Sequence, residues 1–267
     1  MSLGFHLMFR ADDDRVLAPS PSARRRLARA VYRVAAPFPM LAFGAADNHL
    51  HVVVLAERPV AAELARRLPS AVRPALALSV PFAPVRYKEL VDQAHSKNAF
   101  HYALRQREHH GVGPDPFLDA TSLPELLGLR VLPTDTLSRV REHLPRLTRA
   151  DLLAHLGLKA LEPVTVADLE LLAMDEATLL DATAAALALP ALSGREAETV
   201  RAHAALVQVL SPALPPGRIA AILDRDGSRV RRLRALPLPP ALLRAVSLQL
   251  ALRAAAEQAT PNEPPTR

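Results

Sequence analysis

Two histidines, His49 and His51, stand one residue apart in the stretch DNHLHVVV. Alternate residues of a β-strand point to the same face, so the two imidazoles would project together while Leu50 points into apolar packing. Two imidazoles on one face can bind a divalent metal ion, and a third ligand would complete the site. A His-x-His pair also occurs by chance, so the pair alone does not establish a metal site.

Tyr102 and Gln106 stand about fifty residues further on, in the stretch HSKNAFHYALRQREHHG. This stretch is typical of a helix, and residues four apart on a helix share a face. Tyrosine can serve as a nucleophile, and the amide oxygen of Gln can coordinate a metal ion. Taken singly, such a Tyr is usually a core or rim residue and such a Gln is usually solvated. Together with the histidine pair, they indicate a metal ion beside a nucleophile.

The composition is that of a packed globular protein with an anionic partner. Of the 267 residues, 50% are hydrophobic and 22% charged, and no apolar run approaches the ~20 residues of a membrane span. The absence of cysteine excludes disulfides and thiolate metal sites and fits the cytoplasm. The N-terminus does not have the pattern of a signal peptide. The net charge of +6 comes mainly from arginine and favours nucleic acid as the partner. GC-rich coding would explain arginine in place of lysine, but not the excess of positive charge.

The first part of the chain predicts alternating strands and helices, with a fourth strand supplied around Gly44. This order predicts an α+β fold with a split β-α-β, ferredoxin-like sheet and helices on one face. Ser22 is the expected N-cap of the first helix, and Pro84 suggests an edge position for the last strand. The expected strands are 4–11, 40–56 with a break at Gly44–Asn48 and a new start at His49, and 82–91. The expected helices are 22–35, 61–68 and 96–110.

Two further parts are predicted from composition. Residues 1–115 would form the first domain, and residues 116–190 a helical linker domain of short Leu/Ala-rich segments separated by prolines. Residues 191–267 would form a helix-turn-helix-like domain with a disordered tail.

The last part carries most of the positive charge, with 11 arginines against 6 acidic residues from Arg195 onward. Apolar residues fall where helix-turn-helix motifs keep them, and the second helix would present arginines to DNA. Asp224 stands where the turn usually has glycine, so an irregular turn is expected. A plain helical hairpin with a charged face explains the same pattern equally well. The apolar positions are Ile219, Ala220, Leu223 and Val230, and the arginines are Arg229, Arg231, Arg232 and Arg234.

The motifs resemble those of single-tyrosine HUH transposases, most closely the REP-associated tyrosine transposases. DNHLHVVV is similar to their His-hydrophobic-His motif, with Asn48 at the expected place before the pair, and VRYKELVDQAHSKNAFHYALRQ resembles the later segment with the catalytic tyrosine. The resemblance covers residues 1 to about 113. The chain departs from it at QREHHG, where the family has NPVRAG, and at Asp47, where a proline is common.

The resemblance implies a mechanism and a set of site residues. Mg²⁺ or Mn²⁺ would be held by His49, His51 and Gln106, and Tyr102 would attack a phosphorus atom to give a 5′-phosphotyrosine and a free 3′-OH. The substrate would be single-stranded or hairpin DNA, cleaved and rejoined in DNA transposition and recombination. Residues expected to contact DNA are Asn48, Arg105, Arg107 and the C-terminal arginines, although a solvated helix face explains the arginines as well. The remaining tyrosines, Tyr32 and Tyr87, are predicted to be structural, and His95, His101, His109 and His110 to be solvated or to face phosphate.

The resemblance also suggests a bacterial, cytoplasmic and nucleoid-associated protein that is a monomer or a homodimer. It would not bind membranes, and its C-terminal domain would bind duplex DNA. Two alternatives remain at this point. One is a domesticated, catalytically silent DNA-binding or regulatory protein on the same fold, and the other is an unrelated basic helical adaptor. The position of Tyr102 relative to the two imidazoles tests the enzyme hypothesis against these alternatives: a tyrosine far from both rings would exclude the enzyme.

Overall fold

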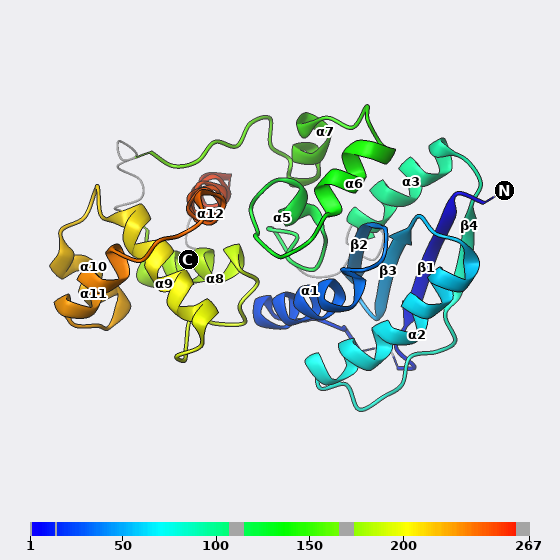
Figure 1. Ribbon diagram of the computed structural model, residues 1–267, viewed down its shortest axis with the longest axis horizontal. Helices are drawn as coiled ribbons and strands as arrows, with labels where there is room; N and C mark the ends of the chain where they lie inside the picture. Colours follow the sequence, from blue (N-terminus) through cyan, green and yellow to red (C-terminus); the bar gives the residue numbers. More distant parts are fainter. Residues whose placement is uncertain (1, 14, 107–114, 166–173, 260–267) are drawn as a thin grey trace, which may run out of the picture. The chain divides into compact units, whose positions relative to one another are not determined.

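The computed structural model describes residues 2–13, 15–106, 115–165 and 174–259 (Figure 1). The chain divides into two compact units: unit 1 comprises Met1–Leu127 and Leu132–Lys159, and unit 2 comprises Gly128–Val131 and Ala160–Arg267. Some predicted features lie outside the described residues: Arg107, His109 with His110, the end of the helix expected at 96–110, part of the Leu/Ala-rich range 116–190, and the C-terminal tail.

Unit 1 is built on one antiparallel sheet in the strand order β2-β3-β1-β4. The predicted α+β class is confirmed. The elements follow the chain as β1 (Gly4–Arg10), α1 (Pro21–Ala35), β2 (Met40–Ala46), β3 (His49–Val54), α2 (Arg58–Ala75), β4 (Arg86–Leu90), α3 (Gln93–Leu104), α5 (Leu123–Leu126), α6 (Thr136–His143), α7 (Arg149–Leu153) and the 3-10 helix η1 (Ala154–Leu156).

Strands β2 and β3 form a hairpin, and this hairpin supplies the fourth strand expected near Gly44. The turn consists of Asp47 and Asn48, with Asp47 in the left-handed region at φ 53°. Asp and Asn tolerate this conformation better than other non-glycine residues. Proline has φ fixed near −65° and could not adopt it.

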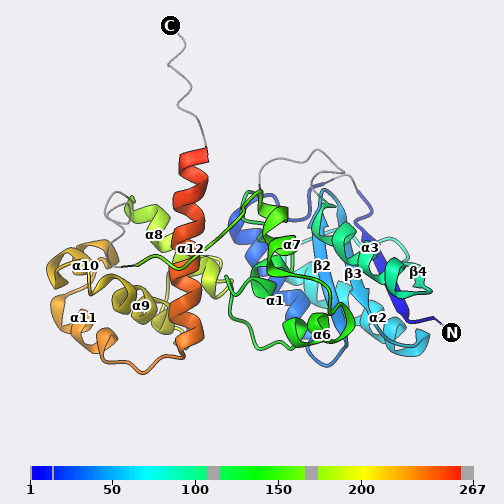
Figure 2. The same cartoon turned by 90° about the horizontal axis from the view of Figure 1, so that it is seen from above.

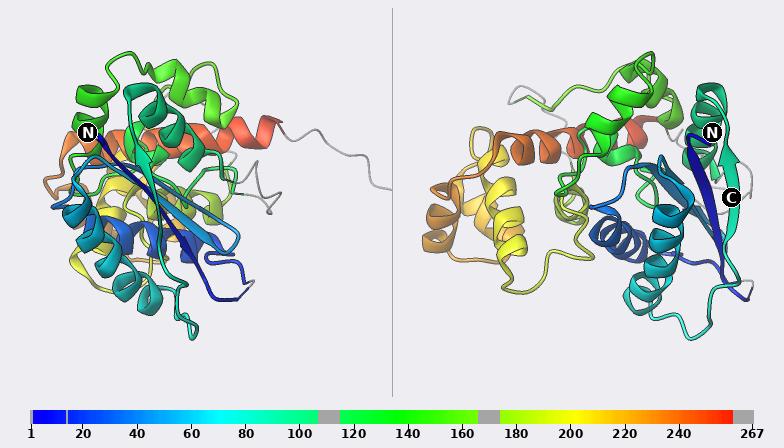
Figure 3. Two further views of the ribbon diagram at one scale, coloured as in Figure 1. Left: turned by 90° about the vertical axis from the view of Figure 1, so that its right-hand side faces the viewer. Right: turned by 45° about the vertical axis from the view of Figure 1, so that its right-hand side comes forward.

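The two faces of the sheet differ in what covers them. Phe5, Leu7 and Phe9 of β1 pair with Val54, Val52 and Leu50 of β3, and this face packs against α1 and α2. Helix α3 contacts β2 and β3 from the opposite face, so that the sheet lies between α3 and the α1–α2 pair (Figures 1 and 3). The expectation that helices cover a single face is therefore wrong.

Residues after 115 continue unit 1, in contrast to the predicted boundary at 115. The segment 120–122 pairs with the outer edge of β2: Ala45 N donates to Ala120 O at 3.0 Å, and Ser122 N donates to Phe43 O at 3.0 Å. An edge strand leaves main-chain groups unpaired, and covering them is favourable. The range 116–190 is thus shared, with residues up to Lys159 mostly in unit 1 and later ones in unit 2.

Two helices of unit 1 begin earlier than their sequence pattern indicates. The N-cap of α1 is Ser20, whose side chain accepts a hydrogen bond from Ala23 N, and not the predicted Ser22. Pro21 occupies the first turn, where its missing N–H costs nothing. Helix α2 spans 58–75 and contains Pro69 and Pro74, so the apolar stripe at 61–68 marked only its centre.

Unit 2 is a helical bundle in which α8 and α9 pack against the long α12 (Figure 2). Its helices are α8 (Glu176–Ala186), α9 (Ala197–Leu210), α10 (Pro216–Leu223), α11 (Gly227–Arg234) and α12 (Pro240–Ala259). Arg253 pairs with Asp181 at 2.6 Å and ties α12 to α8. None of the described helices is both long enough and apolar enough to cross a membrane.

Candidate active site

The strand register places His49 and His51 on the sheet face that α3 partly covers. His49 pairs with Arg10 of β1, and His51 pairs with Met8. Directly paired residues of antiparallel strands share a face, so Arg10 joins the two histidines there. Leu50 points to the apolar core on the other face and is 1% exposed.

Gly44 of β2 brings α3 close to this face. It pairs with His51, and a Cβ atom built on it would lie 1.7 Å from the main-chain oxygen of Ala103 in α3. The helix backbone therefore rests directly on the glycine, an approach that no other residue type allows. Tyr102, the neighbour of Ala103, is thereby held beside His51.

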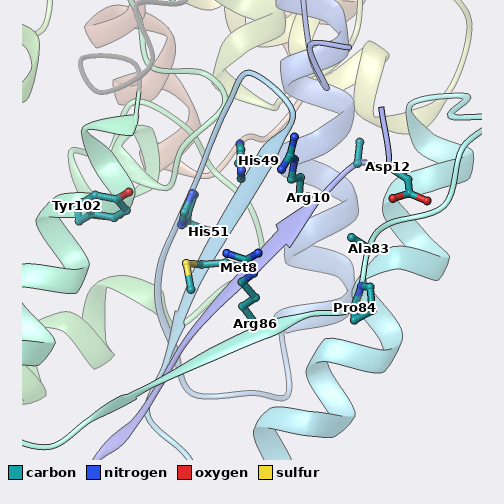
Figure 4. A pocket seen from close by; sticks show the side chains of 10 residues that line it. Met8, Arg10, Asp12, His49, His51, Ala83, Pro84, Arg86 and Tyr102 are labelled. Carbon is teal, nitrogen blue, oxygen red and sulfur yellow. The ribbon is translucent and has the colours of Figure 1, made fainter. Parts of the chain in front are cut away.

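Tyr102 projects from α3 across the sheet toward the histidines (Figure 4). Its ring centroid lies 5.4 Å from that of His51, with the rings nearly perpendicular at 79°. Tyr102, His49 and His51 line one pocket of about 420 Å³, together with Met8, Arg10, Ala11, Asp12, Ala83, Pro84 and Arg86. The tyrosine side chain is 38% exposed, so a ligand in the pocket can reach it.

His6 of β1 supports His51 from behind. Its Nε2 lies 3.0 Å from Nδ1 of His51, and the ring is only 5% exposed. Burial, reinforced by the positive charges of Lys88 and His95, lowers the pKa of His6 to about 4. A hydrogen bond to one ring nitrogen fixes the tautomer and the orientation of an imidazole. The contact therefore leaves Nε2 as the ring atom through which His51 can coordinate.

Gln106 lies one helical turn beyond Tyr102 and is 1% exposed. Its Nε2 donates a hydrogen bond to the carbonyl oxygen of Tyr102 at 2.8 Å. Within the described residues its Oε1 is buried with no hydrogen-bond partner. An unpaired buried oxygen is costly, and a metal ion would satisfy it. Gln106 is, however, not among the residues that line the pocket.

The remaining predicted DNA contacts of unit 1 lie in different settings. Asn48 is 2% exposed, and its side-chain amide donates to the main-chain oxygen of Asp13 at 2.9 Å. This bond ties the hairpin to the segment after β1, and a DNA contact for Asn48 stays a prediction. Arg105 is exposed at the C-terminal end of α3.

The arginines of unit 2 lie on α11, which a short turn joins to α10. Asp224 ends α10 in the left-handed conformation, at φ 49°, so it takes the backbone shape for which glycine is usual. Asp226 caps α11 by accepting a hydrogen bond from Arg229 N at 2.8 Å. Arg231, Arg232 and Arg234 are exposed, Arg229 is half-buried, and Ile219, Leu223 and Val230 are buried.

Sequence reasoning missed His6, Arg10, Asp12 and Arg86 as neighbours of the site. The signal for the first two was the alternation in GFHLMFRA, where apolar Phe5, Leu7 and Phe9 predict a core face. The intervening His6 and Arg10 then belong to the other face. Which strand that face would meet depends on register, which the sequence does not give.

A second histidine pair contains His101, the residue before Tyr102, and His155. His101 Nδ1 lies 3.0 Å from Nε2 of His155 in η1, and the two rings are stacked at 20°. Burial and the neighbouring cations Arg105 and Lys97 lower the pKa of His101. Burial and His101 lower the pKa of His155 to about 4. The pair joins α3 to η1 within unit 1.

We expect this pair to make the protein less stable in mild acid. The unfolded chain takes up protons near pH 6.5, whereas folded His155 does so only near 4, so its contribution is complete above 6.5 and is lost as the pH falls toward 4. After allowance for solvent screening, the loss should be on the order of 1 kcal/mol. Urea unfolding at about pH 7 and pH 4.5 measures it. His155→Gln should reduce the pH dependence of the free energy of unfolding. His143→Gln, at an exposed position, should leave it unchanged. Equal pH dependence in the two variants would contradict the assignment to His155.

Comparison with known proteins gives limited similarity. No family model and no curated protein matches the chain. Among solved structures, it is similar to the REP-associated tyrosine transposase bound to a REP hairpin, with 16% identity and a TM-score of 0.36 over 42% of this chain and 70% of that chain. Similarity at this level concerns the fold alone.

Proposed function

We propose that unit 1 is a metal-dependent, single-tyrosine HUH nuclease and strand transferase that acts on single-stranded DNA. One observation carries the proposal: Tyr102 lies over the same sheet face as His49 and His51, with its ring centroid 5.4 Å from that of His51. The strand order β2-β3-β1-β4 and the chain order β-α-β-β-α-β-α are those of a ferredoxin-like split β-α-β sheet. This agreement supports the proposal, because the resemblance implies such a sheet.

Tyr102 would act as the nucleophile. Its phenolic oxygen forms a bond to the phosphorus while the bond from phosphorus to the 3′-oxygen breaks. The phenol gives its proton to solvent, and the leaving 3′-oxygen takes one up as the 3′-OH. The 5′-phosphotyrosine conserves the energy of the phosphodiester, so a 3′-OH end can reverse the step and rejoin the strand.

His49, His51 and Gln106 are the residues that would hold Mg²⁺ or Mn²⁺. Among the described residues no group of three or more His, Asp or Glu side chains is arranged to hold a metal ion, so within them the third ligand would be of another type. The buried Oε1 of Gln106 suits that role because it lacks a hydrogen-bond partner within the described residues. When bound, the ion would supply Lewis-acid polarisation of the scissile phosphate.

The residues around the histidines suit an anionic substrate. Arg10 and Arg86 line the same pocket as Tyr102 and would contact the DNA backbone. His6 would act as a positioning residue, because its hydrogen bond fixes the ring of His51. Such outer partners orient metal-binding imidazoles in many sites.

Unit 2 would add binding to duplex DNA. Helices α10 and α11 would serve as the helix-turn-helix-like pair, and α11 presents Arg231, Arg232 and Arg234 to solvent. An exposed helix of this charge suits the major groove or the phosphate backbone. A cytoplasmic, nucleoid-associated location in a bacterium belongs to the same proposal.

The alternative is a catalytically silent DNA-binding protein on the same fold. The absence of Gln106 from the pocket lining favours it, because a silent protein does not need a complete set of metal ligands.

The test is to incubate the full chain with a library of hairpin-forming single strands and Mn²⁺. We expect a covalent protein–DNA adduct that resists denaturation and is absent when a chelator is present. DNA binding without an adduct across the library would contradict the proposal and support the silent alternative.

A further inference from the structure

Tyr102 stands between two pockets, of which the proposed chemistry uses only one. The second, of about 310 Å³, is lined by His6, Met8, Lys88, His95, Asn98, Ala99 and Tyr102. Tyr102 and Met8 line both pockets, so the tyrosine ring forms part of the wall of each. A strand whose scissile phosphate reaches Tyr102 from the first pocket can continue into the second.

The second pocket is built from regular elements. His95, Asn98 and Tyr102 recur at helical spacing on one face of α3. Lys88 of β4 pairs with His6 of β1, which places both on the face that α3 covers. The positions of the cationic and amide groups are therefore determined by the register of β4 with β1 and by the spacing of residues on one face of α3.

Strand β4 supplies one cation to each pocket. Arg86 lines the first and Lys88 the second. Two residues along a strand correspond to about 7 Å. This spacing is of the order of the distance between consecutive phosphates of an extended single strand.

The charge of the second pocket is positive. Within the described residues no carboxylate lines it, and neither Lys88 nor Arg86 forms an ion pair. Glu89, the residue after Lys88, points to the opposite face of the sheet, where it pairs with Phe5. The ammonium of Lys88 is exposed and available to an anion.

We propose that Lys88, with His95 and Asn98, binds the phosphodiester next to the one that Tyr102 attacks. This inference rests on the proposed function of unit 1 and adds a second phosphate subsite to it. The two subsites would hold the strand on both sides of the tyrosine, and so fix the position at which the strand is cut.

The test measures binding in a Tyr102→Phe background, in which the strand is bound but cannot be cut. We expect Lys88→Gln to weaken binding of a single strand about 5- to 10-fold and to lower the slope of log affinity against log salt by about 0.7, the value for one lost phosphate contact. Lys97→Gln is the matched control, because Lys97 is an exposed lysine on α3, the helix that carries His95 and Asn98, and lines neither of the two pockets. It should leave both quantities unchanged.

A neutral methylphosphonate placed at each phosphate in turn locates the contact. At the phosphate next to the cleavage position, the substitution should weaken binding by the parent but have no further effect on the Lys88→Gln variant. Equal losses in parent and variant at that position, or a Lys88→Gln variant that binds like the parent, would overturn the subsite. If the subsite is overturned in this way but the chain with Tyr102 intact still forms the covalent adduct, the proposed function stands without the second phosphate subsite. Failure of the parent to bind single strands at all would contradict both.

Discussion

Replacement of Tyr102 by phenylalanine should reduce adduct formation and strand cleavage by at least about 10³-fold, because the change removes the attacking oxygen. The side chain is 38% exposed, and the ring remains to pack against His6 and His51. The fold and the affinity for single-stranded DNA should therefore be kept. Cleavage is measured with a 5′-labelled hairpin strand, and binding by fluorescence anisotropy.

The two other tyrosines of the chain serve as controls. Tyr32 is buried against Phe43 in the α1–α2 core. Tyr87 pairs with Leu7 on that same face, and the guanidinium of Arg58 lies 3.5 Å from its ring centroid. Tyr32→Phe and Tyr87→Phe should each cleave within a few-fold of the parent. A Tyr102→Phe variant that cleaves as well as these controls would rule out Tyr102 as the nucleophile.

Replacement of Gly44 by alanine should move α3 away from the sheet and lower the rate of cleavage by displacing Tyr102. The added Cβ would lie 1.7 Å from the oxygen of Ala103, so the helix backbone must move. Overpacking of this kind costs about 1–3 kcal/mol of stability. A displacement of about 1 Å at the nucleophile can lower the rate about 10²-fold. Urea unfolding and adduct formation measure the two effects.

Gly217 provides the matched substitution, because a Cβ built on it meets no atom within 4 Å. Gly217→Ala should change the free energy of unfolding by no more than about 0.5 kcal/mol and leave cleavage intact. If Gly44→Ala behaves in the same way, the direct contact between α3 and β2 does not position Tyr102.

Local pattern predicted the strands and helices of the site well. The alternation of residues around Leu50 placed His49 and His51 on one face, and the register of β1 and β3 agrees. The stretch around Gly44 became a hairpin because Asp47 and Asn48 suit a tight turn. These features depend on residues that are neighbours in the sequence, and they can therefore be predicted from it.

Tertiary contacts were not predictable in the same way. The hydrogen bond of His6 to His51 depends on which strand pairs with β3, and the approach of α3 depends on the missing side chain of Gly44. Residues 116–159 look like independent helices in sequence, yet the segment 120–122 completes the edge of the sheet. Apolar periodicity shows that a helix has a buried face but not what covers it.

The most direct test of the account is to locate the covalent bond. The full chain is incubated with a hairpin-forming single strand and Mn²⁺, the adduct is digested with protease and nuclease, and the modified peptide is sequenced by mass spectrometry. The account predicts a nucleotide 5′-phosphate attached to the oxygen of Tyr102. Attachment to Tyr32, Tyr87 or a serine, or no adduct under conditions in which the strand is bound, would contradict it.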